Sequence, residues 1–414
     1  MKHAMAGPLA GVCVLDLTWV LSGPYAAMTL CDLGAEVIKV ERPPYGDIAR
    51  TTAPFIGNES AYFISINRGK RSVALNLRAP EGREAFLRLV ERVDVVLENF
   101  TPGVMAKLGL DYATLSARNP RLIMCSISGF GQTGPDRHLP ALDIVVQGIG
   151  GVMSITGEPG GRPVRPGLSL GDIAAGLYAA IGVLASLHER ERSGRGQCID
   201  VSMLDCQLAI LENAFTRYFV TGETPRPLGT RHPSATPFQA FPTKDGYIVV
   251  ALSWGEENQW QLLCGILGLP ELLDDERFET SGKRTAHHAL LEPILSAAFR
   301  RRTTAEWLED LRAAGIPCGP LNTIPEAAAM PQVRAREMIV EVEHPKVGPL
   351  KLINHPVKFS RTPAGIQGPP PSVGQDTRRV LRELAGLDDA TIDRLLAAGI
   401  ALETDPRTAP PIPH

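Results

Sequence analysis

Asp172 stands within GLSLGDIAAG (residues 167–176), where a carboxylate opens a predicted helix with glycines on both sides. An aspartate at a helix start is most often an N-cap, which stabilises the fold by ~1 kcal/mol. The glycines, however, let a ligand or another backbone approach closely. The free N–H groups of a helix N-terminus also favour a charged, nucleophilic carboxylate or hold a developing oxyanion. Asp172 is therefore a candidate nucleophile.

The sequence lacks the usual motifs for nucleotide and metal cofactors. The loop TWVLSGPYAA after the first predicted strand has no G-x-G-x-x-G, which argues against a nicotinamide or flavin. GFGQTG at 129–134 is not a P-loop, because no Lys-Ser/Thr follows the glycines. No cysteine pair has C-x-x-C spacing, so buried, reduced thiols are predicted instead of metal ligands or disulfides. The cysteines are Cys13, Cys31, Cys125, Cys198, Cys206, Cys264 and Cys318.

Charge and hydropathy exclude two classes of partner. The chain has 42 Lys and Arg against 45 Asp and Glu, a net charge of −3. Nucleic-acid binders need a basic excess, because neutralising phosphates supplies most of their affinity. The start, MKHAMAGPLAG, lacks the apolar core of a signal peptide. Ile173–Leu187, the longest uncharged stretch, is shorter than the ~18–20 residues of a membrane span. We expect a cytoplasmic protein with no nucleic-acid or membrane partner.

Short apolar runs alternate with helical patterns over the first 130 residues. The helical segments are Pro24–Leu33, which Gly34 stops, and Pro80–Arg92, which has Pro in its first turn. This alternation predicts an α/β fold with a Rossmann-like parallel sheet. The predicted strands are Val12–Leu17, Glu36–Glu41, Ser72–Leu77, Asp94–Glu98 and Leu122–Ser128.

A long helix is predicted to begin at Asp172 and to end at Ser193-Gly194. Its apolar side chains recur at helical spacing and predict one apolar face. They are Ile173, Leu177, Ile181, Leu184 and Leu187.

The composition changes after this first part of the chain. Thr221–Pro237 carries four prolines, which is typical of a linker. Phe238–Phe241 and Tyr247–Leu252 then flank Lys-Asp-Gly, a hairpin pattern. We predict a large domain built from both chain ends and a smaller α+β domain inserted between them. The large domain takes residues 1–220 and 349–414, the linkers 221–237 and 325–348, and the small domain 238–324.

Six blocks resemble the class III coenzyme A transferase family, which includes the formyl-CoA, carnitine and bile-acid CoA transferases. They are GVCVLDLTWVLSGPYAAMTLCDLGAEVIKVERP, then Gly46-Asp47, then NRGKRSVALNL, DVVLENFTPGVMAKLGLDYATL, NPRLIMCSISGFGQTGP and GDIAAGLYAAIGVLASLHERERSGRGQCIDVSMLD. The blocks follow the family's order from Leu9 to about Leu211. Weaker echoes (YIVVAL, GIPCGPLNT, HPKVGPLKL, PPPSVGQDT) extend to about Leu381. Each block alone is weak, but six in order are specific.

The resemblance implies a carboxylate nucleophile, and Asp172 occupies that motif position. The family's reaction moves CoA between two acids. A carboxylate suits this transfer because it can carry first the acyl group of a donor thioester and then the CoA thiol. Serine and cysteine cannot become an acyl group that a thiolate captures. Both intermediates react with water, so the site should exclude solvent. CoA and acyl-CoA are substrates, with no tightly bound cofactor and no metal.

The family analogy also assigns contacts to CoA. They are Val20, Arg42, the backbone around Lys70, Arg71, Ser72 and Val73, then Asn99, Phe100, Lys107, Leu108 and Leu142. Arg42 and Lys107 suit the phosphates of CoA, although such cations are more often solvated surface charges. Asn99 ends an apolar strand, which is where open α/β sheets bind ligands.

Departures from the family pattern narrow the substrate class. Many members have an aromatic residue where Leu142 precedes Asp143 here. Oxalate-using members carry a run of glycines in the inserted domain, and none lies between Pro237 and Pro270, which argues against a formyl/oxalate enzyme. GTRHPSATPFQAF with DGYIVVAL is more similar to members that use succinyl-CoA and short dicarboxylates.

Loop cations are the candidates for binding the acceptor acid. Arg50, Arg231 and His232 lie in predicted loops, and a cation cluster would suit the far carboxylate of a dicarboxylic acid. Ordinary loop charges are the alternative. The predicted reaction is transfer of CoA, with succinyl-CoA as donor, to a short dicarboxylic acid.

Two other functions and one assembly are compatible with the resemblance. In the 2-methylacyl-CoA racemase branch a His-Asp pair moves protons, and the His would fall at Leu142, which cannot do so. A silent CoA-ester-binding paralogue is disfavoured because Asp172 keeps its flanking glycines. The resemblance also implies an interlocked ring homodimer, with which the proline-rich crossings are compatible.

Overall fold

The computed structural model describes residues 7–253 and 258–405. The chain folds into two compact units. Unit 1 comprises Met1–Val152, Arg165–Gly222 and Gln332–His414, and unit 2 comprises Met153–Val164 and Glu223–Pro331. Both chain ends thus contribute to unit 1. The sequence-based prediction placed residues 153–164 in the large domain, whereas in the structure they belong to unit 2.

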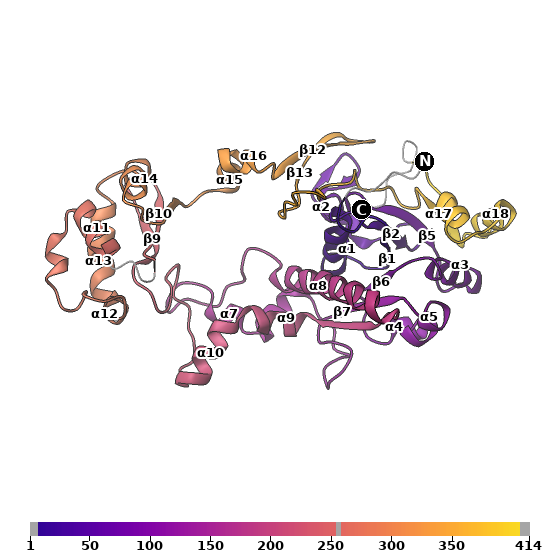
Figure 1. Cartoon of the computed structure of the whole chain (residues 1–414), viewed down its shortest axis with the longest axis horizontal. Helices are drawn as coiled ribbons and strands as arrows, with labels where there is room; N and C mark the ends of the chain where they lie inside the picture. Colours follow the sequence, from indigo (N-terminus) through magenta and orange to yellow (C-terminus); the bar gives the residue numbers. More distant parts are fainter. Residues whose placement is uncertain (1–6, 254–257, 406–414) are drawn as a thin grey trace. The chain divides into compact units, whose positions relative to one another are not determined.

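A seven-stranded sheet lies at the centre of unit 1 (Figure 1), in the order β14-β5-β2-β1-β6-β7-β8. Six strands are parallel, and β14 is antiparallel to β5 at one edge. This confirms the predicted large parallel sheet built from both chain ends. The strands are β1 (Cys13–Asp16), β2 (Glu36–Glu41), β5 (Arg71–Leu75), β6 (Val95–Glu98), β7 (Ile123–Ser128), β8 (Cys198–Ser202) and β14 (Ala401–Leu402).

Helices and short hairpins complete unit 1. The hairpins are β3 (Phe55–Ile56) with β4 (Glu59–Ser60), and β12 (Ile339–His344) with β13 (Gly348–Ile353). The helices are α1 (Ser22–Asp32), η1 (Ile48–Thr51), α2 (Ala61–Asn67), α3 (Pro80–Val90), α4 (Val104–Lys107), α5 (Tyr112–Arg118), α6 (Asp143–Ile149), α8 (Leu170–Ser193), α9 (Met203–Ile210), α10 (Glu212–Thr221), α17 (Thr377–Glu383) and α18 (Asp389–Ala397). Two further helices cross the unit boundaries, α7 (Val152–Ile155) and α16 (Pro331–Ala335).

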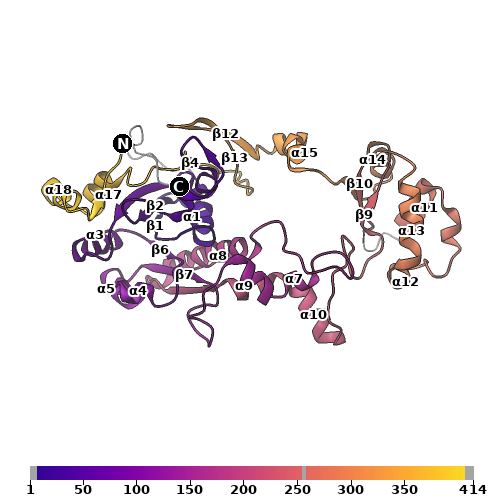
Figure 2. The ribbon, with the colours of Figure 1, turned by 180° about the vertical axis from the view of Figure 1, so that it is seen from behind.

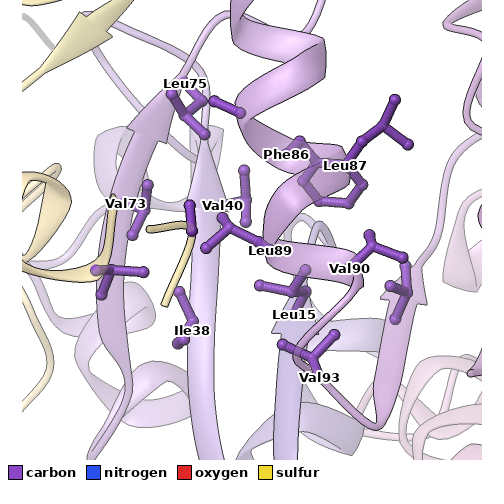
Figure 3. Close-up of a cluster of buried hydrophobic side chains, with 14 of the residues drawn as sticks. Leu15, Ile38, Val40, Val73, Leu75, Phe86, Leu87, Leu89, Val90 and Val93 are labelled. Atoms are coloured by element: carbon purple, nitrogen blue, oxygen red, sulfur yellow. The ribbon is translucent and has the colours of Figure 1, made fainter. Parts of the chain in front are cut away.

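Helices cover both faces of the sheet (Figure 2). Successive strand residues point to opposite faces, so Val14 packs in one cluster with α1 and α8, while Leu15 packs in the other with α3. Figure 3 shows the second cluster, where Phe86 and Leu89 of α3 lie against strand residues such as Val40. Burial on both faces explains why these strands are continuous apolar runs in the sequence.

The α8 helix packs mainly through small residues, and of the predicted apolar face only Leu187 is buried. Leu177 and Ile181 of that face are 43% and 58% exposed, whereas Ala175 is fully buried. A Cβ at Gly176 would lie 2.7 Å from the Ser22 carbonyl oxygen, so glycine is needed where α8 approaches α1. The helix is long and apolar enough to span a membrane, but its alanine face packs into the core of unit 1, as in a soluble protein.

Unit 2 has a three-stranded antiparallel sheet in the order β11-β10-β9. The hairpin pattern around Lys-Asp-Gly is confirmed, because β9 and β10 pair with Tyr247 opposite Pro242. Phe241 and Phe299 stack in its core with ring centroids 4.8 Å apart. The elements are β9 (Phe238–Pro242), β10 (Tyr247–Ala251), α11 (Asn258–Leu267), η2 (Pro270–Leu273), α12 (Ser281–Ala286), α13 (His288–Phe299), α14 (Thr304–Ala313), β11 (Cys318–Pro320) and α15 (Ile324–Ala329).

Candidate active site

A cavity of about 220 Å³ lies at the carboxyl ends of β1, β6 and β7 in unit 1. This edge of a parallel α/β sheet is where ligands bind. The loops after β1 and β6, the segment between β7 and α6, and the first turn of α8 line it. The polar side chains that bear on its chemistry are Ser22, Asn99, Ser128, Arg137, Asp143 and Asp172.

Asp172 lines this cavity from the first turn of α8. The helix begins at Leu170 with Ser169 as its N-cap, so Asp172 is not the cap residue, contrary to the simpler interpretation of the sequence. Ser22, at the start of α1, lines the same cavity, and its hydroxyl lowers the pKa of the Asp172 carboxyl by stabilising the charged form. The candidate nucleophile and a hydroxyl that stabilises its charge thus come from two helices in close contact.

Burial is the main reason why the pKa of the Asp172 carboxyl is raised to about 7, and the negative charge of Asp143 adds to it. The Ser22 hydroxyl and the charge of Arg165 act in the opposite direction and lower this pKa. A carboxyl with this pKa is divided between its neutral and charged forms at neutral pH. Desolvation of the charged form makes it a stronger nucleophile than a solvated carboxylate, which suits attack on a thioester.

Asp143 occupies the N-terminus of α8. Its Oδ1 accepts the N–H groups of Gly171 at 2.9 Å and Asp172 at 3.4 Å. Its Oδ2 lies 3.1 Å from the Arg165 guanidinium and 2.6 Å from Gln147 Nε2. These N–H groups are therefore engaged, and the sequence-based idea that they hold an oxyanion or keep Asp172 charged is wrong for this conformation.

The loop after β1 holds Val20 at a φ of 64°, a left-handed conformation that is rare for a β-branched residue. Asn99 fixes this loop on one side, because its Oδ1 accepts the Trp19 N–H and its Nδ2 donates to the Trp19 carbonyl, both at 2.8 Å. Asp47 fixes the other side by accepting the Val20 N–H at 3.2 Å. The clamped loop leads directly into Ser22.

Charged side chains near this loop form what we call the buried polar layer. It consists of three ion pairs, Lys70–Asp16 at 2.8 Å, Lys39–Asp47 at 2.9 Å and Arg50–Glu41 at 2.6 Å. All six side chains are at most 3% exposed. The layer supports the ends of β1 and β2 and, through Asp47, the Val20 turn.

Two residues that the sequence assigns to ligand binding lie in this layer. The Arg50 guanidinium donates to Glu41 and to the Pro371 carbonyl, and it does not line the cavity. The Lys70 ammonium likewise donates to Asp16 and Asn67. This geometry commits the Arg50 guanidinium to partners inside unit 1, and a role toward the acceptor acid stays a prediction. Sequence spacing carries no sign of such internal pairing.

Some of the sequence-assigned CoA contacts meet Asp172 in one place. Val20, Asn99, Phe100 and Leu142 all line the cavity. Phe100 packs edge-on against Trp19, with ring centroids 6.4 Å apart. The cavity therefore joins the candidate nucleophile to four of the assigned positions.

The other assigned contacts lie outside this cavity. Arg42 and Lys107 are exposed, and Leu108 packs against the core cluster beside α3. In β5, Arg71 pairs with Glu36 at 2.5 Å, while Ser72 and Val73 are fully buried. Arg231 and His232 belong to unit 2, where the His232 ring lies 5.0 Å from that of Phe238. Their roles stay predictions.

Sequence reasoning missed four polar residues of the cavity. Ser22 has a signal, because the SGP tripeptide opens a helix next to the assigned Val20. Asp143 follows the assigned Leu142, yet its position at the N-terminus of α8 depends on tertiary packing. Ser128 lies at the end of a strand and Arg137 in the loop that follows it, and no motif marks either residue. Only the fold shows that these side chains face Asp172.

The chain is similar in sequence to known CoA-transferases. The family model for CoA-transferase family III matches residues 9–377. The human succinyl-CoA:glutarate CoA-transferase is 42% identical over 394 residues, covering 95% of this chain and 90% of that protein. The acetyl-CoA:oxalate CoA-transferase of Acetobacter aceti is 43% identical over 355 residues, covering 86% and 90%.

A solved structure shares the fold over most of the chain. The crystal structure of a CAIB/BAIF family protein from Brucella suis superposes with a TM-score of 0.81 at 39% sequence identity. The match covers 92% of this chain and all of that one.

Proposed function

This chain belongs to CoA-transferase family III and is a CoA-transferase, and we propose that it moves CoA from succinyl-CoA to a short dicarboxylic acid through covalent intermediates on Asp172. The observation that carries the proposal is a partly desolvated carboxylate, held by Ser22, in a cavity at the binding edge of the sheet. A carboxylate nucleophile is the group that such an exchange between two acids requires.

The first half-reaction loads CoA onto the enzyme. A carboxylate oxygen of Asp172 attacks the thioester carbonyl of the donor, and the C–S bond breaks to give a mixed anhydride and CoA thiolate. The thiolate then attacks the aspartyl carbonyl, releasing the donor acid as a carboxylate and leaving an aspartyl-CoA thioester. No net proton is taken up or lost.

The second half-reaction passes CoA to the acceptor. The acceptor carboxylate attacks the aspartyl thioester, expelling CoA thiolate and forming a second mixed anhydride. The thiolate attacks the acceptor's acyl carbonyl, which yields the new acyl-CoA and regenerates the Asp172 carboxylate. Burial around Asp172 limits the access of water to these intermediates.

The dicarboxylate class is supported by the relatives. One uses succinyl-CoA and glutarate, and another uses acetyl-CoA and oxalate. The missing glycine run therefore gives no ground for excluding oxalate, because an oxalate enzyme is among the similar proteins. We include two- to five-carbon dicarboxylic acids among the acceptors to be tested.

Coenzyme binding and assembly complete the proposal. Val20, Asn99, Phe100 and Leu142 contact CoA near Asp172, and Arg42 and Lys107 pair with its phosphates from outside the cavity. The enzyme is a soluble, interlocked homodimer. Support for these points comes from the family resemblance and, for the first four residues, from their shared cavity.

The test is to trap the enzyme–CoA intermediate. Protein incubated with succinyl-CoA, digested and examined by mass spectrometry should carry the mass of CoA on the peptide with Asp172, and hydroxylamine should then inactivate it. Asp172→Asn should bind CoA but gain no adduct. Transfer by wild type without an adduct on this peptide would contradict the proposal, as would exchange of an α-proton in D2O without transfer.

A further inference from the structure

Arg137 is the one cation among the described residues that line the Asp172 cavity. The charged side chains that share the cavity with it are Asp143 and Asp172. Arg137 lies in the loop between β7 and α6, so it reaches the cavity from a different segment than Asp172 does. A cation at this place has the charge that an acidic ligand requires.

The guanidinium of Arg137 has no carboxylate within 4 Å among residues 7–253 and 258–405. Its Nε–H donates to His138 Nε2 at 2.9 Å, which orients the group and leaves both terminal NH2 groups available. Arg165, by contrast, is paired with Asp143. An arginine with free terminal nitrogens binds a carboxylate with two parallel hydrogen bonds.

A second polar group in the same cavity has unused hydrogen-bonding capacity among the described residues. Ser128, at the carboxyl end of β7, is 93% buried, and its hydroxyl has no hydrogen-bond partner among the described residues. Buried hydroxyls are normally satisfied. An oxygen-rich ligand in the cavity would satisfy Ser128 and Arg137 together.

We infer that Arg137 binds the second carboxylate of the acceptor acid and so selects dicarboxylic over monocarboxylic acids. This inference rests on the proposed function, in which the first carboxylate reacts at Asp172. A monocarboxylic acid would place a methyl group against the guanidinium and leave the cation without a partner. Hydrogen bonds to charged groups contribute enough to make this a discrimination of about ten- to a hundredfold.

Kinetics with matched acceptors test the inference. In a double displacement the donor acid leaves before the acceptor binds, so kcat/KM for an acceptor does not depend on the donor. With succinyl-CoA as donor, Arg137→Gln should lower kcat/KM for glutarate by about ten- to a hundredfold. The value for pentanoate should stay unchanged, so the ratio of the two kcat/KM values should fall by the same factor. Arg92→Gln, which removes an exposed arginine with the same change in charge, should behave as wild type.

Binding of free CoA separates this role from phosphate binding. The dissociation constant of CoA, measured by calorimetry, should be the same for wild type and Arg137→Gln. The inference would be overturned if kcat/KM of Arg137→Gln fell equally for glutarate and pentanoate, or if it did not fall for glutarate. Weaker CoA binding by the variant would overturn it as well. A wild-type enzyme that transfers no CoA to any dicarboxylate would instead overturn the proposed function. Thermal unfolding of each variant shows whether the fold is retained.

Discussion

The buried polar layer and the Asp172 cavity treat a carboxylate in opposite ways. Burial alone would raise the pKa of Asp16 in the layer, but Lys70 and Lys39 bring it below its ordinary value. Arg50 likewise holds the pKa of Glu41 at about 2 against the effect of burial. In the cavity, burial prevails, and with the charge of Asp143 it raises the pKa of Asp172 to about 7, while Arg165 pairs with Asp143.

This difference separates structural charges from a reactive one. A carboxylate that a cation pairs with directly is stabilised as a charge and loses nucleophilicity, as the layer requires. Asp172 has a hydroxyl as its partner and a neighbouring carboxylate that repels it. Perturbed carboxyls of this kind are typical of functional sites.

The largest effect is expected for Asp172→Asn. Loss of the nucleophile should lower CoA transfer at least about a thousandfold. Stability should move in the opposite direction, since the variant removes a carboxylate that is costly to bury. Transfer assays and thermal unfolding at pH 5 and pH 8 measure both effects.

The sign of the stability change follows from the pKa. Between the ordinary value of 3.8 and about 7 the folded protein holds a proton that the unfolded chain has lost, so wild type loses stability as the pH rises through this window. Asp172→Asn should therefore be more stable than wild type at pH 8, and the difference should be smaller at pH 5, where wild type has lost only part of this stability. A variant that is less stable at pH 8 would contradict the contrast with the layer.

Breaking the layer should unfold the protein more readily. Lys70→Met leaves Asp16 buried without its partner, which costs about 3–5 kcal/mol of the free energy of unfolding. Urea titration measures this, and Lys351→Met, at an exposed position of β13, is the control. Equal midpoints for the two variants would show that the layer is not structural.

Ser22→Ala tests whether a hydroxyl, and not a cation, stabilises the charged form of Asp172. Removing the donor should raise the pKa of Asp172 further, so that the rise of kcat/KM with pH moves to higher pH. At pH 7 the rate should fall about three- to tenfold, the value of one ordinary hydrogen bond. Ser116→Ala, a half-buried serine in α5 whose hydroxyl donates to the Ala113 carbonyl, is the control. A profile that stays in place would remove Ser22 from the site.

Asp143→Asn should have the smallest effect and the opposite sign. The amide oxygen can still accept the Gly171 N–H, while the lost negative charge lowers the pKa of Asp172. The rise of kcat/KM with pH should then move to lower pH, with less than about a tenfold change at pH 8. A shift to higher pH would show that Asp143 does not act on Asp172 through its charge.

The sheet and the place of Asp172 in the first turn of a long helix were the predictable parts of this molecule. Strands such as Val95–Glu98 are buried on both faces, so their apolar runs stand out in the sequence. Asp172 stands out through its glycines and the motif around it. Both patterns are local in the sequence, so they can be recognised without knowledge of the fold.

Pairings between distant residues were not predictable. Asp143 caps a helix that begins 27 residues later, and Arg50 is committed to Glu41 inside the protein. For α8, large apolar residues at helical spacing suggested the packing face, yet alanines and Gly176 pack because they let α1 come close. A one-dimensional pattern does not record which face meets a neighbour.

Oxygen labelling tests the central claim most directly. When an acceptor with 18O in both carboxylates attacks the aspartyl-CoA thioester, the bridging oxygen of the anhydride stays on Asp172 as CoA leaves with the acyl group. Each turnover should therefore transfer one 18O to the Asp172 carboxylate, detected as a gain of mass on its peptide. Continued CoA transfer with an unlabelled Asp172 would contradict the account.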